Sequence, residues 1–475
     1  MEQLYKILSC AIFLFLSFMS QGYSLDELSQ IKQTLADKRY GNYWDRMDAI
    51  KKLKALDSKE AGAMLISLLD DQEAPIREAA VMALGTFTNK ETIDSLILVL
   101  INSKSKLQRL NSAWVLGLIK NQPVLDSLLK ALNIEPDKEV IVRIIKSIGL
   151  LPNTPESEAQ LIARLSDNDA KVRAASAEVL GNLRSQKSYP EIMKRLSDSN
   201  VMVRIATLDA IAFIKPLESI SYLEKALKDP LPEIRIAAIE NLAKSDADKT
   251  IITKAATDLL KDKSQAVRTT AKQILNIKIE PLPGETRPVF FGIPIIGNPI
   301  FIIDFSGSMK TLITTGENKG LCKIDVAIKE LESALKQLPA TSKFNIIFCS
   351  TEATGNQRMV SKTMLPATES NKSTALNFVK SLWNRLQDIK RGRGDHYDAL
   401  IEALSEPELD TILLLSDGEP TYGTYIQNQN IIDNIQENNR FKKVVINTIV
   451  TGKTGTNLAL MQKLAEMSNG ICTKR

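Results

Sequence analysis

The sequence contains a single histidine, His396, and only four cysteines in 475 residues. One histidine excludes zinc sites built on several imidazoles and leaves one candidate for any histidine-dependent catalytic triad. Aromatic residues make up 5% of the chain, which indicates helices that pack through aliphatic side chains. The net charge is only +5, from 61 basic and 56 acidic residues. So small an excess argues against a dedicated nucleic-acid-binding protein, and we expect no nucleic-acid partner.

Long apolar runs are also scarce, and the clearest one, Ile7 to Met19, lies behind Lys6 at the N-terminus. A membrane-spanning helix needs about 20 apolar residues, so this run is short for a permanent anchor. Small and polar residues follow at positions 20–24, as in a secretory signal peptide. We therefore expect residues 1–24 to be removed on export to the periplasm, the cell surface or the medium, leaving no transmembrane span. An uncleaved anchor is the alternative.

Residues 25–276 contain an internal repeat. One position, occupied by arginine in all units but one, recurs every 31 to 33 residues: Arg46, Arg77, Arg109, Ile141, Arg173, Arg204, Arg235 and Arg268. Eight residues later most units have a small residue, and six residues earlier five units have an aspartate. A fixed period of this length is typical of a solenoid.

Each unit has the pattern of two helices. In the unit that contains Arg173 we expect helices over 158–165 and 172–183, joined by a turn rich in capping residues at 166–169. The small residues of the second helix would let neighbouring units stack closely, and we interpret the recurring Asp and Arg as a structural ladder between adjacent turns. These motifs resemble HEAT-type repeats. The resemblance implies a curved α-solenoid with a long binding face, and it implies no chemistry.

A linker rich in proline and glycine covers residues 277–298, and a different pattern begins at residue 299. The linker also carries apolar residues, so we expect it to pack against the domain that follows. In residues 299–475 buried strands at 300–303, 343–349, 411–415 and 444–450 alternate with helices at 325–338, 373–386 and 458–467. This alternation predicts an α/β doubly wound, Rossmann-like domain, whose ligands bind at the carboxyl ends of the strands.

Polar residues cluster at those strand ends. Asp304, Ser306 and Ser308 follow the first strand, and Asp417 follows the strand at 411–415. A loop containing Asp395 lies between them in the sequence. All of these side chains offer hard oxygen ligands, which suit Mg²⁺, Mn²⁺ or Ca²⁺ better than zinc or copper. We therefore predict a divalent cation at this edge of the sheet.

The Asp304-x-Ser306-x-Ser308 motif, with Asp417-Gly418 downstream, resembles the metal-ion-dependent adhesion site (MIDAS) of a von Willebrand factor type A (VWA) domain. The resemblance covers residues 299–475. It implies that Asp304, Ser306 and Ser308 hold the cation, with Asp417 acting behind them or through water. It also implies Mg²⁺ as the usual ion and an open coordination position that takes a carboxylate from a protein partner. The family's threonine is missing, because Gly394 stands at its position.

Asp395 is the nearest donor to the missing threonine, and we expect it to take that place. Its added negative charge would shift the preference toward Ca²⁺ or Mn²⁺. The alternative is that Asp395 points away and that water fills the gap left by Gly394.

Cys322, Cys349 and Cys472 remain after loss of the signal segment, which allows one disulfide and one free thiol. In the doubly wound topology Cys322 begins a helix and Cys349 ends a strand, both near the carboxyl edge of the sheet. If a disulfide forms, we expect it between Cys322 and Cys349.

Two classes of function fit these features. The first is a non-enzymatic, exported scaffold for protein–protein interaction and adhesion, with a solenoid surface and a metal-dependent binding domain. The second is a Mg²⁺-dependent phosphatase similar to haloacid dehalogenases, with Asp304 as nucleophile. Such enzymes carry a second aspartate two residues on as general acid, and this chain has Ser306 there, which favours binding over catalysis.

Overall fold

The structure is a computed structural model, and it describes residues 25–38, 42–120, 122–277, 287–314, 318–350, 358–386, 393–451 and 455–475. The expected signal peptide, residues 1–24, lies outside these ranges. The chain divides into two compact units, Met1–Ser219 and Ile220–Arg475. None of the helices in the described ranges is both long and apolar enough to span a bilayer.

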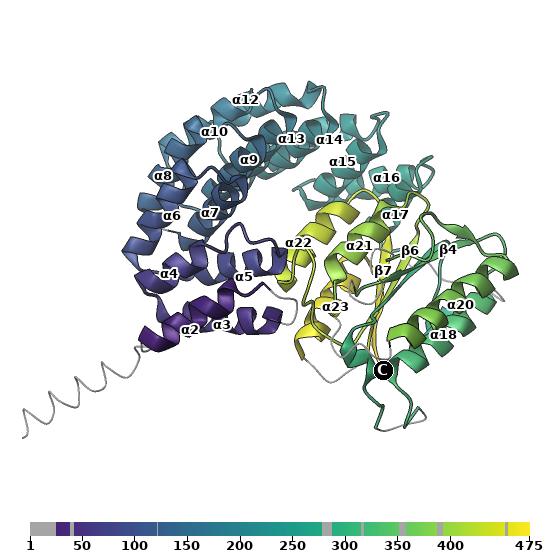
Figure 1. Cartoon of the computed structure of the whole chain (residues 1–475). Helices are drawn as coiled ribbons and strands as arrows, with labels where there is room; N and C mark the ends of the chain where they lie inside the picture. The colour runs from purple at the N-terminus through teal and green to yellow at the C-terminus, as the bar shows by residue number, and fades with distance from the viewer. Residues whose placement is uncertain are drawn as a thin grey trace, which may run out of the picture. The chain divides into compact units, whose positions relative to one another are not determined.

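The repeat region consists of paired helices, as predicted. The first helices of the pairs are α2 (Leu25–Ala36), α4 (Lys59–Ile66), α6 (Lys90–Asn102), α8 (Gln122–Ile134), α10 (Pro155–Arg164), α12 (Tyr189–Met193) with η2 (Lys194–Ser197), α14 (Pro216–Ala226) and α16 (Lys249–Leu259). The second helices are α3 (Tyr43–Leu56), α5 (Ala74–Leu84), α7 (Lys106–Ile119), α9 (Lys138–Ile148), α11 (Ala170–Asn182), α13 (Val201–Ile214), α15 (Pro232–Lys244) and α17 (Gln265–Ile274). In the first unit the two sets form two layers (Figure 1). In each pair, the second helix contains one of the eight repeating positions. The predicted spacing of the repeat is therefore confirmed.

Capping residues explain why α10 and α11, the helices of the unit that contains Arg173, begin earlier than expected. Helix α10 begins at Pro155 because Thr154 accepts a hydrogen bond from Ser157 N and forms a capping box. Helix α11 begins at Ala170 because the Asp169 carboxylate accepts from the backbone N–H groups of Lys171 and Val172. The apolar pattern alone placed both starts too late, since the first turn of each helix is polar.

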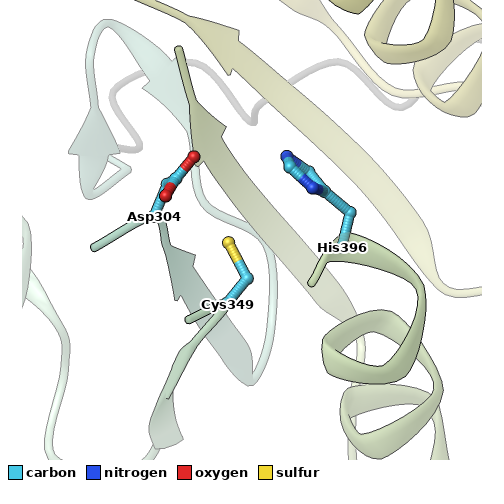
Figure 2. A group of neighbouring side chains, drawn as sticks. All are labelled: Asp304, Cys349 and His396. Atoms are coloured by element: carbon cyan, nitrogen blue, oxygen red, sulfur yellow. The ribbon is translucent and has the colours of Figure 1, made fainter. Parts of the chain in front are cut away.

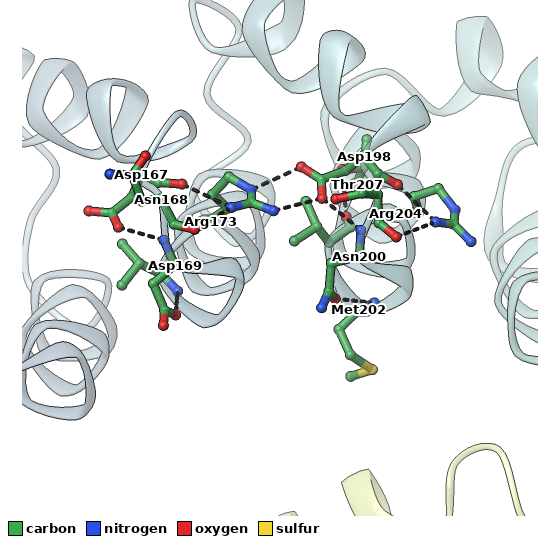
Figure 3. Close-up of polar contacts among 12 residues, drawn as sticks. Asp167, Asn168, Asp169, Arg173, Asp198, Asn200, Met202, Arg204 and Thr207 are labelled. Atoms are coloured by element: carbon green, nitrogen blue, oxygen red, sulfur yellow. Dashed lines mark hydrogen bonds and ion pairs between the residues drawn. The ribbon is translucent and has the colours of Figure 1, made fainter.

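The predicted Asp–Arg ladder is present, and Figure 3 shows one step of it. The Arg173 guanidinium donates to the backbone oxygen of Asp167 (2.9 Å) in its own unit. It also donates through Nε and Nη2 to both carboxylate oxygens of Asp198 in the next unit, at 2.9 and 2.8 Å. Its hydrogen bond lowers the pKa of Asp198. Equivalent pairs link successive units elsewhere: Arg46–Asp71, Arg109–Glu135 and Arg235–Asp262. The recurring charges therefore have a structural role.

The small residues of the second helices allow close stacking, also as predicted. A Cβ atom built on Gly117 would lie 2.7 Å from the Cβ of Ser147 in the following unit. One built on Gly181 would lie 2.7 Å from the Cα of Ala210. Real Cβ atoms do not approach other carbons this closely, so glycine sets the spacing between these units.

The α/β domain contains one six-stranded sheet of order β5-β4-β3-β6-β7-β8. The strands are β3 (Pro299–Ile303), β4 (Lys343–Phe348), β5 (Leu365–Pro366), β6 (Thr411–Ser416), β7 (Val445–Val450) and β8 (Cys472–Lys474). All neighbours pair in parallel except β5, which runs antiparallel to β4. The predicted succession of helical repeats and an α/β domain is thus confirmed, with a mixed sheet rather than a purely parallel one.

Helices cover both faces of this sheet (Figure 1). Helices α18 (Lys323–Gln337) and α20 (Glu369–Leu386) pack on one face. Helices α21 (His396–Ser405), α22 (Asn428–Asn439) and α23 (Gly455–Met467) pack on the other. Two apolar cores result, one on each side of a sheet whose central strands are fully buried. The carboxyl ends of β3, β4, β6 and β7 meet at one edge.

The described part of the linker, residues 287–298, packs against the α/β domain, as expected. Strands β1 (Val289–Phe290) and β2 (Ile293–Pro294) form a two-stranded hairpin. Phe290, Ile293 and Ile295 are buried in the core on the α18 side of the sheet. The linker therefore extends the hydrophobic core of this domain.

Candidate metal centre

Two neighbouring strands bring the predicted ligands together. Strand β3 pairs in parallel with β6, in a register that sets Ile303 beside Leu415. The backbone N–H of Asp304 then donates to Leu415 O at 3.0 Å, so Asp304, which follows β3, lies beside Ser416, the last residue of β6. Because both strands end here, their loops share one edge of the sheet.

Hydrogen bonds connect the four side chains that the MIDAS motif identified. The Asp304 carboxylate accepts from the backbone N–H of Ser306 at 2.7 Å. The hydroxyl oxygens of Ser306 and Ser308 are 2.9 Å apart, and Ser308 Oγ donates to Asp417 Oδ1 at 2.6 Å. The turn of η3 (Gly307–Lys310) places the two serines on the same side. The structure thus brings Asp304, Ser306, Ser308 and Asp417 into one cluster.

Both carboxylates of this cluster are buried. Asp304 is 1% exposed and Asp417 is 5% exposed. Burial raises the pKa of Asp304, against hydrogen bonds from Ser416 and Ser306 that lower it. Burial, and then the charge of Asp304, raise the pKa of Asp417, against the contacts with Lys323 and Ser308. Two buried, like-charged carboxylates need a nearby positive charge, and Lys323 Nζ supplies one at 2.6 Å from Asp417 Oδ2.

The donor set fits a hard divalent cation. The four side chains offer carboxylate and hydroxyl oxygens, the ligands that Mg²⁺, Mn²⁺ and Ca²⁺ prefer. Ser308 is exposed while Asp304 is buried, so the cluster reaches from the protein interior to the surface. Such a cluster could hold a cation and leave a coordination position facing outward.

Asp395 has partners other than these four residues. Its Oδ1 accepts from the backbone N–H of Asp398 at 3.1 Å, which caps helix α21. Its Oδ2 accepts from the Arg358 guanidinium at 2.7 Å. Burial raises the pKa of Asp395 to about 7, against the opposing charge of Arg358. These contacts favour the arrangement in which Asp395 is turned away from the missing threonine's position, and its role as a ligand stays a prediction.

A second group of side chains lies beside Asp304, and no sequence motif links its three members. Asp304, Cys349 and His396 each place one ligand atom within 4.8 Å of the other two (Figure 2). All three are buried. They come from the end of β3, the end of β4 and the first residue of α21. The group could hold a metal ion, and unlike the first cluster it contains sulfur and nitrogen.

Ser416 connects the two groups. Its Oγ donates to Asp304 Oδ2 at 2.6 Å and lies 2.8 Å from His396 Nε2. With the serine proton directed to Asp304, we assign the imidazole proton of His396 to Nε2. Burial lowers the pKa of His396 to about 4, so the ring is neutral at neutral pH. The buried Nδ1 has no hydrogen-bond partner among the described residues.

The expected disulfide between Cys322 and Cys349 does not form. Cys322, Cys349 and Cys472 are all free thiols. Cys322 Sγ donates to Lys310 O at 3.1 Å and packs on the α18 side of the sheet. Cys349 is fully buried on the opposite side, among residues of α21 and β6. Both thiols lie near the carboxyl edge, as expected, but the sheet itself separates them.

Two family models match the chain. Residues 158–243 match the model described as HEAT repeats, and residues 300–473 match the von Willebrand factor type A domain. Each match falls inside the region where the corresponding motif was found, so both resemblances are confirmed. Among curated proteins, no relative matches this chain.

Solved structures similar to this chain share little sequence with it. YibA of E. coli has 20% identity and a TM-score of 0.35, over 56% of this chain and 97% of its own. The CpcE–CpcF complex of phycocyanin lyase from Nostoc has 19% identity and a TM-score of 0.32, over 53% and 89%. Human deoxyhypusine hydroxylase has 20% identity and a TM-score of 0.24, over 55% and 97%. Identities and TM-scores this low carry no argument about function.

Proposed function

Since this chain joins HEAT repeats to a von Willebrand factor type A domain, we propose that it is an exported protein-binding scaffold. In this proposal Asp304, Ser306, Ser308 and Asp417 hold a divalent cation, and the cation binds a carboxylate of a protein partner. The helical repeats offer a second interaction surface. Both modules are typical of protein interaction and neither brings a catalytic apparatus of its own.

The hydrogen-bonded chain from Asp304 to Asp417 is the observation that carries this proposal. It joins two loops that are more than 100 residues apart in the sequence. The backbone N–H of Ser306 donates to Asp304, and oxygen–oxygen contacts connect Ser306 to Ser308 and Ser308 to Asp417. A purely structural turn would not need two buried carboxylates this close together. A cation at this position would stabilise the ionised form of both, since nearby positive charge lowers a carboxylate's pKa.

Calorimetric titration of the full chain with Mg²⁺, Mn²⁺ and Ca²⁺ tests the cation site. We expect one ion per chain, with Mg²⁺ the ion favoured by the resemblance. Asp304→Ala and Ser308→Ala should each weaken binding at least about tenfold. Ser333→Ala, an exposed serine on α18, is the matched control and should bind as the parent does. A parent protein that binds none of the three ions contradicts the proposal.

Asp395→Ala in the same titration decides whether this residue takes the place of the missing threonine. Weaker binding, with a loss of preference for Ca²⁺ or Mn²⁺, would assign it to the cation. Unchanged binding would leave the four-residue site intact and assign Asp395 to capping α21 and pairing with Arg358.

A pull-down with the full chain, with and without EDTA, tests the partner. The proposal expects a captured protein that is released by EDTA and is absent when Ser308→Ala replaces the parent as bait. Substituting acidic residues on the captured protein, one at a time, then identifies the carboxylate. Capture that resists EDTA but is lost with solenoid variants would assign binding to the repeats instead.

Export is a separate part of the proposal, supported by the pattern of residues 1–24. N-terminal sequencing or the intact mass of the native protein tests it. We expect the mature chain to begin after Gly22 or Ser24, and a chain that still begins near Met1 would favour an anchor.

The phosphatase alternative is tested with p-nitrophenyl phosphate and Mg²⁺. The binding proposal expects no turnover above that of Asp304→Ala. Turnover that disappears in Asp304→Ala would favour the enzyme.

A further inference from the structure

We infer that Asp304, Cys349 and His396 form a second metal site in the α/β domain, which takes a borderline transition metal such as Zn²⁺. The site lies beside the cluster of Asp304, Ser306, Ser308 and Asp417 and shares only Asp304 with it. It goes beyond the proposed binding function, because it can exist whether or not the first site binds a partner.

Backbone hydrogen bonds fix the three elements that supply the ligands. Cys349 N donates to Ile303 O at 3.1 Å, which sets the end of β4 beside the residue that precedes Asp304. Asp395 N donates to Cys349 O at 3.1 Å, which sets the start of α21, and therefore His396, beside the same cysteine. Figure 2 shows the three side chains directed into the space between these elements. The backbone thus positions the ligand atoms before any ion arrives.

The spacing of the ligand atoms suits a tetrahedral ion after a small adjustment. They lie within 4.8 Å of one another. Zinc at about 2.0–2.3 Å from each ligand separates tetrahedral ligand atoms by about 3.5 Å. Small side-chain rotations that move the ligand atoms by about an ångström would bring their separations to the tetrahedral value. Three protein ligands leave a fourth position for water.

The unmet hydrogen-bonding capacity of His396 points to a ligand. The ring is fully buried, and its Nδ1 has no hydrogen-bond partner among the described residues. Leaving a buried polar nitrogen unpaired is unfavourable, because it has lost its hydrogen bond to water without gaining another. A neutral imidazole with a free lone pair is the form that binds a metal ion. A metal ion would give this nitrogen of His396 the partner that the described residues do not supply.

The chemistry of the three ligands selects the metal. A thiolate and an imidazole favour Zn²⁺, Co²⁺ or Ni²⁺ over Mg²⁺ and Ca²⁺. Binding converts the Cys349 thiol to a metal-bound thiolate and releases its proton to the solvent. One thiolate, one carboxylate and one divalent ion then sum to zero charge, which suits a buried site.

The two oxygens of Asp304 face different neighbours. Oδ1 accepts from Ser306 N in the loop of the first cluster, and Oδ2 accepts from Ser416 on the side of His396. One carboxylate can therefore belong to both sites, with one oxygen turned toward each. Ser416 would lose its acceptor to the second ion and would retain Gly418 O, 3.2 Å away, as another.

Cobalt titration of the EDTA-treated full chain, under reducing conditions, tests the second site. Co²⁺ bound to a thiolate gives a near-ultraviolet charge-transfer band that oxygen ligands do not give. We expect this band to saturate at one equivalent, to be displaced by Zn²⁺ and to resist excess Mg²⁺. Cys349→Ala should abolish it, whereas Cys322→Ala and Cys472→Ala, the two other described thiols, should retain it.

Further variants separate this inference from the proposed function. Ser306→Ala with Ser308→Ala should retain the cobalt band while losing Mg²⁺ and Mn²⁺ binding. His396→Gln should weaken Co²⁺ binding at least about tenfold, and it replaces Cys349→Ala as the deciding variant if the latter does not fold. No band in a folded parent protein, or a band that persists in the folded Cys349→Ala and His396→Gln proteins, would overturn the inference.

Discussion

Lys323 Nζ lies 2.6 Å from Asp417 Oδ2, so the chain itself supplies a positive charge to the cluster of oxygen-bearing side chains at this sheet edge. Lys323 is the first residue of α18, and its side chain is one-fifth exposed, while that of Asp417 is almost fully buried. An ion entering the cluster must either displace this ammonium group or tolerate its charge. The lysine therefore opposes the binding of the cation that we propose.

Replacing Lys323 should strengthen cation binding. In Lys323→Met the repulsion between ammonium and metal is removed, and two unit charges a few ångströms apart near a protein surface interact by more than about 1 kcal/mol. We expect Mg²⁺ or Mn²⁺ to bind at least about tenfold more tightly, as measured by calorimetry. Lys329→Met, at an exposed position of the same helix, is the control and should not change the affinity. Equal or weaker binding in Lys323→Met would show that the lysine does not compete.

The solenoid ladder should depend on the shape of arginine and not on charge alone. Arg173 contacts both oxygens of Asp198 and two backbone oxygens of its own turn. A lysine cannot make these contacts together, so Arg173→Lys should lower the free energy of unfolding by about 1–2 kcal/mol. Arg204 donates to two backbone oxygens, and Arg204→Lys should cost less. Urea denaturation followed by circular dichroism measures both, and equal losses would contradict the bidentate explanation.

His396 should make the metal-free protein less stable in mild acid. Its folded pKa of about 4 lies below the ordinary histidine value of 6.5, so the unfolded chain binds the proton more readily between these values. The stabilisation is complete above pH 6.5 and is lost as the pH falls through about 4, by up to about 3 kcal/mol. His396→Gln should remove this slope. Because the chain has one histidine, an imidazole NMR titration assigns the pKa without ambiguity.

Asp395 should make the metal-free protein more stable in mild acid, over nearly the same pH range in which His396 makes it less stable. Its folded pKa of about 7 lies above the ordinary aspartate value of 3.8, so the folded state binds the proton more readily between these values. This contribution is complete below pH 3.8 and is lost as the pH rises through about 7. The two slopes oppose each other in the parent protein. Asp395→Asn should therefore expose a steeper loss of stability in acid than the parent shows, and an unchanged profile would refute the shifted pKa.

The repeat and the proximity of Asp304, Ser306, Ser308 and Asp417 were predictable, because each depends on closely spaced residues or on a regular period. The arginine positions recur every 31 to 33 residues, and the ladder follows from that period together with the aspartate six residues before. Asp304, Ser306 and Ser308 lie within one loop, and the parallel order of β3 and β6 is enough to bring Asp417 to them.

The second cluster could not be found in this way, because its ligands stand 45 and 47 residues apart as single residues without a motif. Cys349 could be placed at a strand end, but the face of the sheet on which its side chain lies depends on where β4 begins its alternation. The same uncertainty explains the wrong disulfide. Helix α22 was missed because its sequence is rich in asparagine and glutamine, and only buried residues such as Ile431 and Ile435 mark its packed face.

The contacts of the ladder all point the same way along the chain, which gives the solenoid a polarity. In each pair the arginine belongs to one unit and the carboxylate to the unit that follows, as with Arg173 and Asp198. A fragment that ends before Asp198 leaves the Arg173 guanidinium without its carboxylate partner at the new terminus. A fragment that begins there takes the carboxylate along, and Asp198 still accepts from Asn200 N. Removing units from the C-terminal side should therefore lower the stability of the remaining repeats more than removing units from the N-terminal side.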